Sequence, residues 1–256
     1  MRDAWVRGVL VAGVAVTACG CTSHSSEMTK PQPDRASEIN LELGIDYLRK
    51  GNLTQAKEKI DRSVSQNPRN AKAQMAAGLL YDRLGEAKKA DGHFDRAISL
   101  DSKDPDIANN YAAFLCRNDR FERGEKFALQ AATNPLYKTP EVAFLNAGNC
   151  ARGGNNLPRA EENYRNALRV RPRFAPALFA MAEIENQQQD YLSSRAFLQR
   201  FMELGRPSPQ SLWLCVRTER ALSNASAASA CAARLKNEYP SAAETKELLE
   251  TERKPG

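Results

Sequence analysis

The chain has 256 residues, of which 42% are apolar and 7% aromatic, enough to bury a substantial core. The 37 lysines and arginines exceed the 31 aspartates and glutamates, and the formal net charge of +6 is spread along the whole sequence. Such a mild bias does not amount to a nucleic-acid footprint. The many Ala, Leu, Glu, Lys and Arg residues favour helices, and one elongated domain fits better than two globular ones.

Residues 1–20 are typical of an export signal, with Arg2 and Arg7 followed by an uncharged, mostly apolar run that is too short to span a bilayer. A cysteine directly after small residues resembles the bacterial lipoprotein box, in which the thiol is acylated and the preceding segment is removed. We favour Cys19, which has a branched apolar residue three places upstream. Cys21 is the alternative, because its acylation would leave an even set of cysteines for an oxidising compartment.

The residue after either candidate cysteine is Gly20 or Thr22, and neither is the aspartate that typically retains such proteins at the inner membrane. The resemblance therefore implies a lipid anchor on the periplasmic face of the outer membrane. Residues 21–36 are rich in polar residues and proline without an apolar period, so we expect a flexible tether. Beyond the anchor no apolar run is long enough to cross a membrane.

A pattern that recurs at an interval of 34 residues dominates the rest of the chain. Its first part is found at Leu43, Gly44 and Tyr47, at Ala77, Gly78 and Tyr81, and at Ala147, Gly148 and Ala151. Its second part follows at fixed offsets, at Ala56, Ile60 and Ser63, at Ala90, Phe94 and Ala97, and at Ala160, Tyr164 and Ala167. This resembles the tetratricopeptide repeat, a helix-turn-helix unit in which small residues let the two helices cross closely and large ones fill the space between them.

Aligned in this way, the repeats begin near Ser37, Ala71, Pro105, Glu141, Ala175 and Pro209, with an insertion of two residues at Thr139 and Pro140. The predicted fold is all-α: a right-handed superhelix of about six repeats over 37–241, followed by a capping helix and tail over 242–256. Its concave face, formed by the first helix of each repeat, suits an extended or helical protein partner.

Local signals support this alignment. Gly51 and Gly85 fall where a first helix ends and a positive φ is needed. The third repeat departs from the consensus at Tyr111 and Gly124, where the first and second repeats carry alanine or another small or apolar residue.

A catalytic site finds little support. The two histidines are His24, in the tether, and His93, at an exposed-type position on a second helix. The cysteines lack zinc-site spacing with histidines, and no glycine-rich phosphate loop follows a strand. We therefore expect no enzyme activity, cofactor, metal or small-molecule substrate.

The cysteines predict two disulfides. Cys116 and Cys150 lie late in the first helices of consecutive repeats, so their side chains are expected to face each other. Cys215 and Cys231 lie on the two helices of one repeat. The alternative for each pair is free thiols packed as small apolar side chains, but an exported protein favours disulfide bonds.

Polar residues on the first helices are candidates for partner binding. Arg49, Arg83 and Arg117 recur every 34 residues at helix ends, where they either bind carboxylates of a partner or, as we favour, complement the negative end of their own helix. Four asparagines lie where repeat proteins either hydrogen-bond a ligand backbone or hold neighbouring repeats together. They are Asn109, Asn110, Asn146 and Asn149.

Apolar residues on the first two repeats form a second candidate surface. Leu41, Ile45 and Leu48 share one helical face, and Met75 and Leu79 take the same positions in the next repeat. This strip either receives an apolar segment of a partner or belongs to ordinary packing between repeats.

The segment from Asn109 to Cys116 and the later segment from Asn146 to Cys150, within this order of signal, cysteine, tether and six repeats, resemble the type IV pilus pilotin family (PilF/PilW). The resemblance covers essentially the whole chain. It implies an outer-membrane lipoprotein that binds the pilus secretin and promotes its localisation and multimerisation, on which twitching motility depends. Alternatives are a repeat lipoprotein of the β-barrel assembly machinery, an adaptor of peptidoglycan enzymes and, from another class, a hydrolase, for which we find no nucleophile and base.

Overall fold

The computed structural model describes residues 33–205 and 207–253, and in this part of the chain it contains thirteen α-helices and no strand. The helices are α1 (Pro33–Arg49), α2 (Leu53–Gln66), α3 (Ala71–Arg83), α4 (Ala87–Leu100), α5 (Pro105–Arg117), α6 (Phe121–Ala132), α7 (Pro140–Gly153), α8 (Leu157–Val170), α9 (Ala175–Gln187), α10 (Tyr191–Met202), α11 (Pro209–Ala221), α12 (Ala225–Glu238) and α13 (Ala243–Arg253). The all-α prediction is confirmed.

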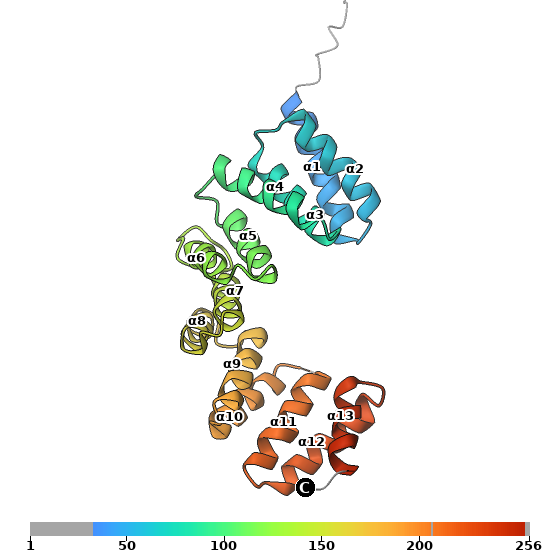
Figure 1. The fold of residues 1–256 in the computed structure, drawn as a ribbon, viewed down its shortest axis with the longest axis vertical. Helices are drawn as coiled ribbons and strands as arrows, with labels where there is room; N and C mark the ends of the chain where they lie inside the picture. Colours follow the sequence, from blue (N-terminus) through green and yellow to red (C-terminus); the bar gives the residue numbers. More distant parts are fainter. Residues whose placement is uncertain (1–32, 206, 254–256) are drawn as a thin grey trace, which may run out of the picture. The chain divides into compact units, whose positions relative to one another are not determined.

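Consecutive helices form six pairs, from α1 with α2 to α11 with α12, and each pair packs against the next, as the order of colours in Figure 1 shows. The odd-numbered helices up to α11 are the first helices of the predicted repeats, and the even-numbered ones are the second helices. The last helix, α13, packs on both α11 and α12 and buries its own Leu248 against them, as a capping helix should.

The turn between the two helices of each pair has a residue with positive φ. Glycine takes this place in the first two pairs, at Gly51 with φ 76° and Gly85 with φ 75°. In the later pairs it is taken by Asp119, Asn155, Gln189 and Ser223. The step from Asp119 to Asn155 is longer than the others by the two residues of the predicted insertion, so the structure keeps the same repeat register throughout.

The two helices of a pair can cross closely because one of them has a small residue at the crossing point. A Cβ atom added to Gly78 would lie 2.8 Å from Cδ2 of Phe94, which is closer than real Cβ contacts, and Gly148 meets Tyr164 in the same way. The small residue and the large one therefore pack as complementary shapes, as the repeat pattern predicts.

The N-terminal boundary differs from the prediction, because α1 begins at Pro33 and so includes residues 33–36, which the sequence assigned to the tether. Proline is well tolerated in a first helical turn, and Asp34 places a negative charge at the positive end of the helix. Ser37 is buried, and its hydroxyl donates to the backbone oxygen of Ser63 at 2.9 Å, which fixes this turn on α2. The predicted signal, Cys19 and Cys21 lie outside the described residues.

Candidate protein-interaction surfaces

Two disulfides join the four cysteines of the folded part in the predicted pairs. Cys116 on α5 is bonded to Cys150 on α7, with a Cα separation of 5.2 Å, and Cys215 on α11 is bonded to Cys231 on α12, with a Cα separation of 6.1 Å. The first bond crosses from the third helix pair to the fourth, which is the junction that contains the two-residue insertion.

Gly124 explains why the third repeat departs from the consensus. A Cβ atom at this position would collide with Sγ of Cys116 and would lie 3.1 Å from Sγ of Cys150. The disulfide therefore occupies the space that the alanine methyl group fills at Ala56, Ala90 and Ala160. The departure was visible in the sequence, but its cause was not.

The predicted arginine column makes contacts inside the protein. Arg83 donates from Nη1 to the backbone oxygen of Leu48 at 2.8 Å, and Arg117 forms an ion pair with Asp82 at 2.5 Å. Arg83 thus complements the negative end of the preceding first helix, α1, rather than of its own helix. Arg117 likewise binds Asp82 of α3, so both guanidinium groups already have partners inside the protein. Arg49 is exposed.

The asparagines mainly link parts of the fold. Asn146 on α7 donates from Nδ2 to Oδ1 of Asn109 on α5 at 2.8 Å, and Asn109 is buried. Asn110 donates to the backbone oxygen of Asp106 in its own helix at 2.8 Å. The structure therefore favours the role of joining neighbouring repeats for Asn109 and Asn146. Asn149 is exposed, although its Oδ1 accepts a hydrogen bond from the Tyr164 hydroxyl at 2.8 Å.

The prediction that Leu41 and Leu48 line an accessible apolar strip is wrong. Both belong to the core that α1 shares with α3, and their exposed fractions are 7% and 6%. Ile45, Met75 and Leu79 are partly buried and pack against the same core. Ordinary packing between repeats, the alternative interpretation, accounts for the strip.

His93 also differs from its predicted exposed position. It is half-buried, its ring stacks on Tyr81 with centroids 5.3 Å apart, and Nδ1 lies 2.8 Å from Oε1 of Gln74. Burial lowers the pKa of the His93 imidazole. These contacts make it a packing residue between α3 and α4.

The outer face of α1 is an apolar surface that the sequence did not single out. Ile39 and Leu43 lie one turn apart and are 51% and 44% exposed. The same repeat positions in the following first helices are buried, at Ala73 and Ala77, Ile107 and Tyr111, Ala143 and Ala147, and Ala177 and Met181. We call the face with Ile39 and Leu43 the open edge.

Contacts of Tyr111 show what covers these positions elsewhere. Its ring stacks on Phe94 of α4, the second helix of the preceding pair, and its hydroxyl lies 2.6 Å from Oδ1 of Asp95. Burial raises the pKa of the Tyr111 hydroxyl well above its usual value, so it stays protonated and donates. Within the described part of the chain, no helix pair precedes α1, so the open edge lacks the cover that a preceding second helix provides.

A groove of about 460 Å³ lies between two first helices, α7 and α9. Half-buried Leu145 and Phe179 supply its apolar side, and Arg152 pairs with Glu183 across it at 2.6 Å. Asn149 also lines it, so one of the predicted partner-binding residues is on an accessible concavity.

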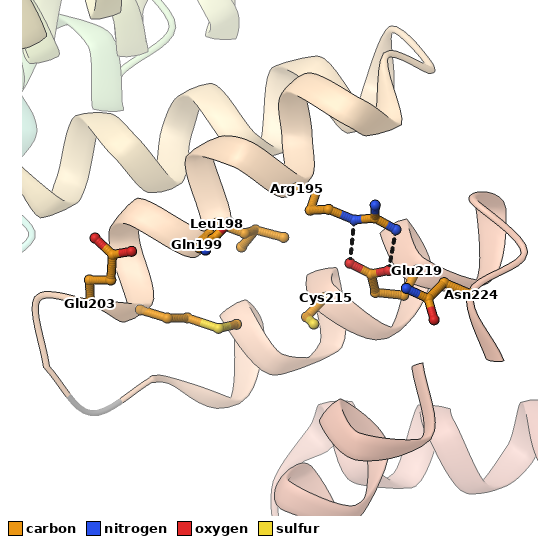
Figure 2. A pocket seen from close by; sticks show the side chains of 8 residues that line it. Arg195, Leu198, Gln199, Glu203, Cys215, Glu219 and Asn224 are labelled. Atoms are coloured by element: carbon orange, nitrogen blue, oxygen red, sulfur yellow. Dashed lines mark hydrogen bonds and ion pairs between the residues drawn. The ribbon is translucent and has the colours of Figure 1, made fainter. Parts of the chain in front are cut away.

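A second cavity, of about 520 Å³, lies between α10 and α11 and is drawn in Figure 2. Arg195 holds the buried carboxylate of Glu219 through two hydrogen bonds, of 2.8 and 2.5 Å, and this contact raises the pKa of the guanidinium. Glu203 lies at the opposite end of the lining (Figure 2). The pair joins the fifth and sixth helix pairs. Among the described residues that line the cavity there is no nucleophile with an adjacent base.

Within residues 33–205 and 207–253, no cluster of three or more His, Cys, Asp or Glu side chains is placed to hold a metal ion. None of the helices in these segments combines the length and apolar character required to cross a bilayer.

The fold and its interaction surfaces define a helical-repeat scaffold. A family model described as tetratricopeptide repeat matches residues 41–134 and 145–209, and the chain belongs to this family. The superhelical fold class expected from the sequence is thereby confirmed, and the match indicates no catalytic family.

Among known proteins the chain is similar to type IV pilus assembly protein PilF of Pseudomonas aeruginosa, with 27% identity over 95% of this chain and 98% of that protein. The solved structure of P. aeruginosa PilF has a TM-score of 0.76 and 26% identity, covering 85% of this chain and 98% of its own. That of PilW, described as a widely conserved type IV pilus biogenesis factor, has a TM-score of 0.78 and 27% identity, covering 83% and 98%.

Proposed function

We propose that this protein is a type IV pilus biogenesis scaffold, and more narrowly an outer-membrane lipoprotein that binds the pilus secretin and promotes its localisation and multimerisation. The observation that carries the proposal is the similarity to PilF along nearly the full length of both proteins. A repeat scaffold acts by presenting surfaces to other proteins, so the partner interaction has to be assigned to one of the surfaces described above.

The open edge of α1 is the surface that we assign to the secretin. Ile39 and Leu43 present two large apolar side chains at positions that every later repeat covers with a helix. An amphipathic helix of the secretin would complete the stack by taking the place of a preceding second helix. The edge also lies on the first helix after the proposed tether, nearest to the proposed lipid anchor.

The test is a double substitution, Ile39→Ser with Leu43→Ser, in cells that assemble pili. We expect fewer heat-resistant secretin multimers and weaker secretin capture by the purified protein, while circular dichroism and the melting temperature stay close to wild type because both side chains are exposed. The matched control is Leu192→Ser with Leu249→Ser, which removes two exposed leucines from α10 and α13. Normal secretin multimers in the Ile39/Leu43 variant would overturn the assignment of this edge.

Deletion of the whole gene tests the broader proposal. If secretin multimers form and reach the outer membrane without this protein, the secretin role is wrong. Capture of β-barrel assembly components or peptidoglycan enzymes from solubilised envelopes would then favour the adaptor alternatives. If the deletion strain places its secretin correctly but assembles pili defectively, the protein acts in pilus biogenesis through a partner other than the secretin.

The lipid anchor is tested separately by mass spectrometry of the mature N-terminus. We expect a diacylated Cys19, with Cys21 as the alternative, in a protein that sediments with outer membranes. An unmodified terminus in the soluble periplasmic fraction would refute the anchor but not the pilus role.

A further inference from the structure

Exposed apolar and basic side chains gather on two neighbouring turns that connect the third, fourth and fifth helix pairs. Leu136, in the turn between α6 and α7, is 84% exposed, and Val170, at the turn between α8 and α9, is 47% exposed. The basic residues beside them are Lys138, Arg169, Arg171 and Arg173, all exposed. We call these six residues the basic turn surface.

Contacts between the turns make them one surface. Arg171, after α8, forms an ion pair at 3.5 Å with Glu141, which follows the turn that contains Leu136. Arg200, near the end of α10, donates from Nη2 to the backbone oxygen of Pro172 at 3.0 Å, which adds a further exposed cation beside the second turn. These contacts tie the second turn to the start of α7 and to α10, so the two turns lie side by side.

Negative charge is scarce on this surface. Glu141 is buried and is the carboxylate paired with Arg171, and Arg169 contacts the neutral amide of Asn166 at 2.6 Å. The exposed Glu203 follows α10, three residues after Arg200 in the sequence, and is not part of the basic turn surface. At the preceding turn, between α4 and α5, Asp101, Asp104 and Asp106 reverse the sign and bound the basic area.

Large apolar side chains set among arginines are poorly suited to solvent but well suited to a lipid surface. Leucine and valine gain free energy by entering the boundary between headgroups and acyl chains, while guanidinium groups pair with lipid phosphates. We propose that the basic turn surface binds anionic phospholipids at a membrane surface, as a contact additional to any covalent lipid. The alternative partner is an acidic protein segment. Such a segment would pair with the arginines but would not require an exposed leucine in the turn.

The surface can be probed with residues 33–256, which form one compact unit of the structure. Binding is measured to vesicles of phosphatidylethanolamine with phosphatidylglycerol and to vesicles of phosphatidylcholine. Arg169→Gln with Arg173→Gln should weaken binding to the anionic vesicles by about fivefold for each arginine, roughly 25-fold together. Leu136→Ser with Val170→Ser should weaken it by on the order of tenfold. The matched charge control is Arg62→Gln with Arg96→Gln, two exposed arginines of α2 and α4, which should bind like wild type.

Insertion is tested by Leu136→Cys carrying an environment-sensitive fluorophore, since the other cysteines of this fragment are in disulfides. A blue shift with anionic vesicles is expected at this position and not at Ser226→Cys, an exposed control on α12. Absence of binding, equal binding of the Arg169/Arg173 variant, or equal shifts at both labels would each overturn the proposal. Binding of polyglutamate in place of vesicles, lost in the same variant, would overturn it in favour of an acidic protein partner. None of these outcomes depends on the secretin.

Discussion

Gly124 and the Cys116–Cys150 disulfide should be energetically coupled, and Gly124→Ala measures the coupling. In the oxidised protein the added methyl group would collide with Sγ of Cys116 and approach Sγ of Cys150 and the backbone oxygen of Ala112, both at 3.1 Å. Overpacking of this kind costs about 1–3 kcal/mol, whereas the change from glycine to alanine inside a helix contributes up to about 1 kcal/mol of stability. The net expectation is a destabilisation of roughly 1–2 kcal/mol.

The same substitution should change sign when the sulfur atoms are absent. In a Cys116→Ala, Cys150→Ala background the collision with sulfur is removed and the helix propensity remains, so Gly124→Ala should be neutral or stabilising by up to about 1 kcal/mol. The double-mutant cycle therefore predicts a coupling energy of about 1–3 kcal/mol, obtained from free energies of unfolding in urea. Gly92→Ala in α4 is the control, because nothing lies within 4 Å of its Cβ and both backgrounds should be stabilised alike. Equal effects of Gly124→Ala in the two backgrounds would show that the disulfide does not select glycine.

Three further measurements address the junctions between helix pairs. Replacing Cys116 and Cys150 with alanine should lower the free energy of unfolding by about 3–4 kcal/mol. In the native, unreduced wild-type protein, a thiol reagent should label neither cysteine. Asn146→Ala leaves the buried Oδ1 of Asn109 without its donor and should cost about 1–3 kcal/mol in a urea titration. The hydrogen bonds from Arg120 lower the pKa of Asp91, so this carboxylate stabilises the protein above its unfolded pKa and loses that effect as the pH falls through the folded pKa. Asp91→Asn should therefore reduce stability more at neutral pH than at an acidic pH below the folded pKa of Asp91, and an equal loss at both would contradict the linkage.

Features set by one repeat alone could be predicted from the sequence. The positive φ of Gly51 and the close approach of Gly78 to Phe94 depend on contacts within a single helix pair. The cysteine pairs were accessible for related reasons. Cys116 and Cys150 lie at near-equivalent positions of adjacent first helices, and Cys215 and Cys231 lie on the two helices of one repeat.

Features that depend on contacts between one helix pair and the next could not be predicted from the sequence of a single repeat. Leu41 and Leu48 have the spacing of an apolar face, but spacing does not distinguish a face that binds a partner from one that packs on α3. Arg83 bonds a carbonyl that is 35 residues away in the sequence, so a local view assigned it to its own helix end. The basic turn surface was missed because its residues come from two turns that only the stack brings together.

The positions of three exposed apolar side chains, those of Ile39, Leu43 and Leu136, follow from the construction of a repeat stack, whereas those of Leu192 and Val170 do not. Each internal first helix has its apolar positions covered by the preceding pair, so apolar surface persists where that cover is missing or where a connection departs from the usual length. Ile39 and Leu43 meet the first condition, and Leu136, in the turn lengthened by the insertion, meets the second. Exposing an apolar side chain to water is unfavourable, and the repeat fold does not require it at either place, since a polar side chain there would leave the packing intact. The proposed interfaces, to a protein at α1 and to lipid at the lengthened turn, would account for these exposed side chains, and the two sets of substitutions above separate the two interfaces experimentally.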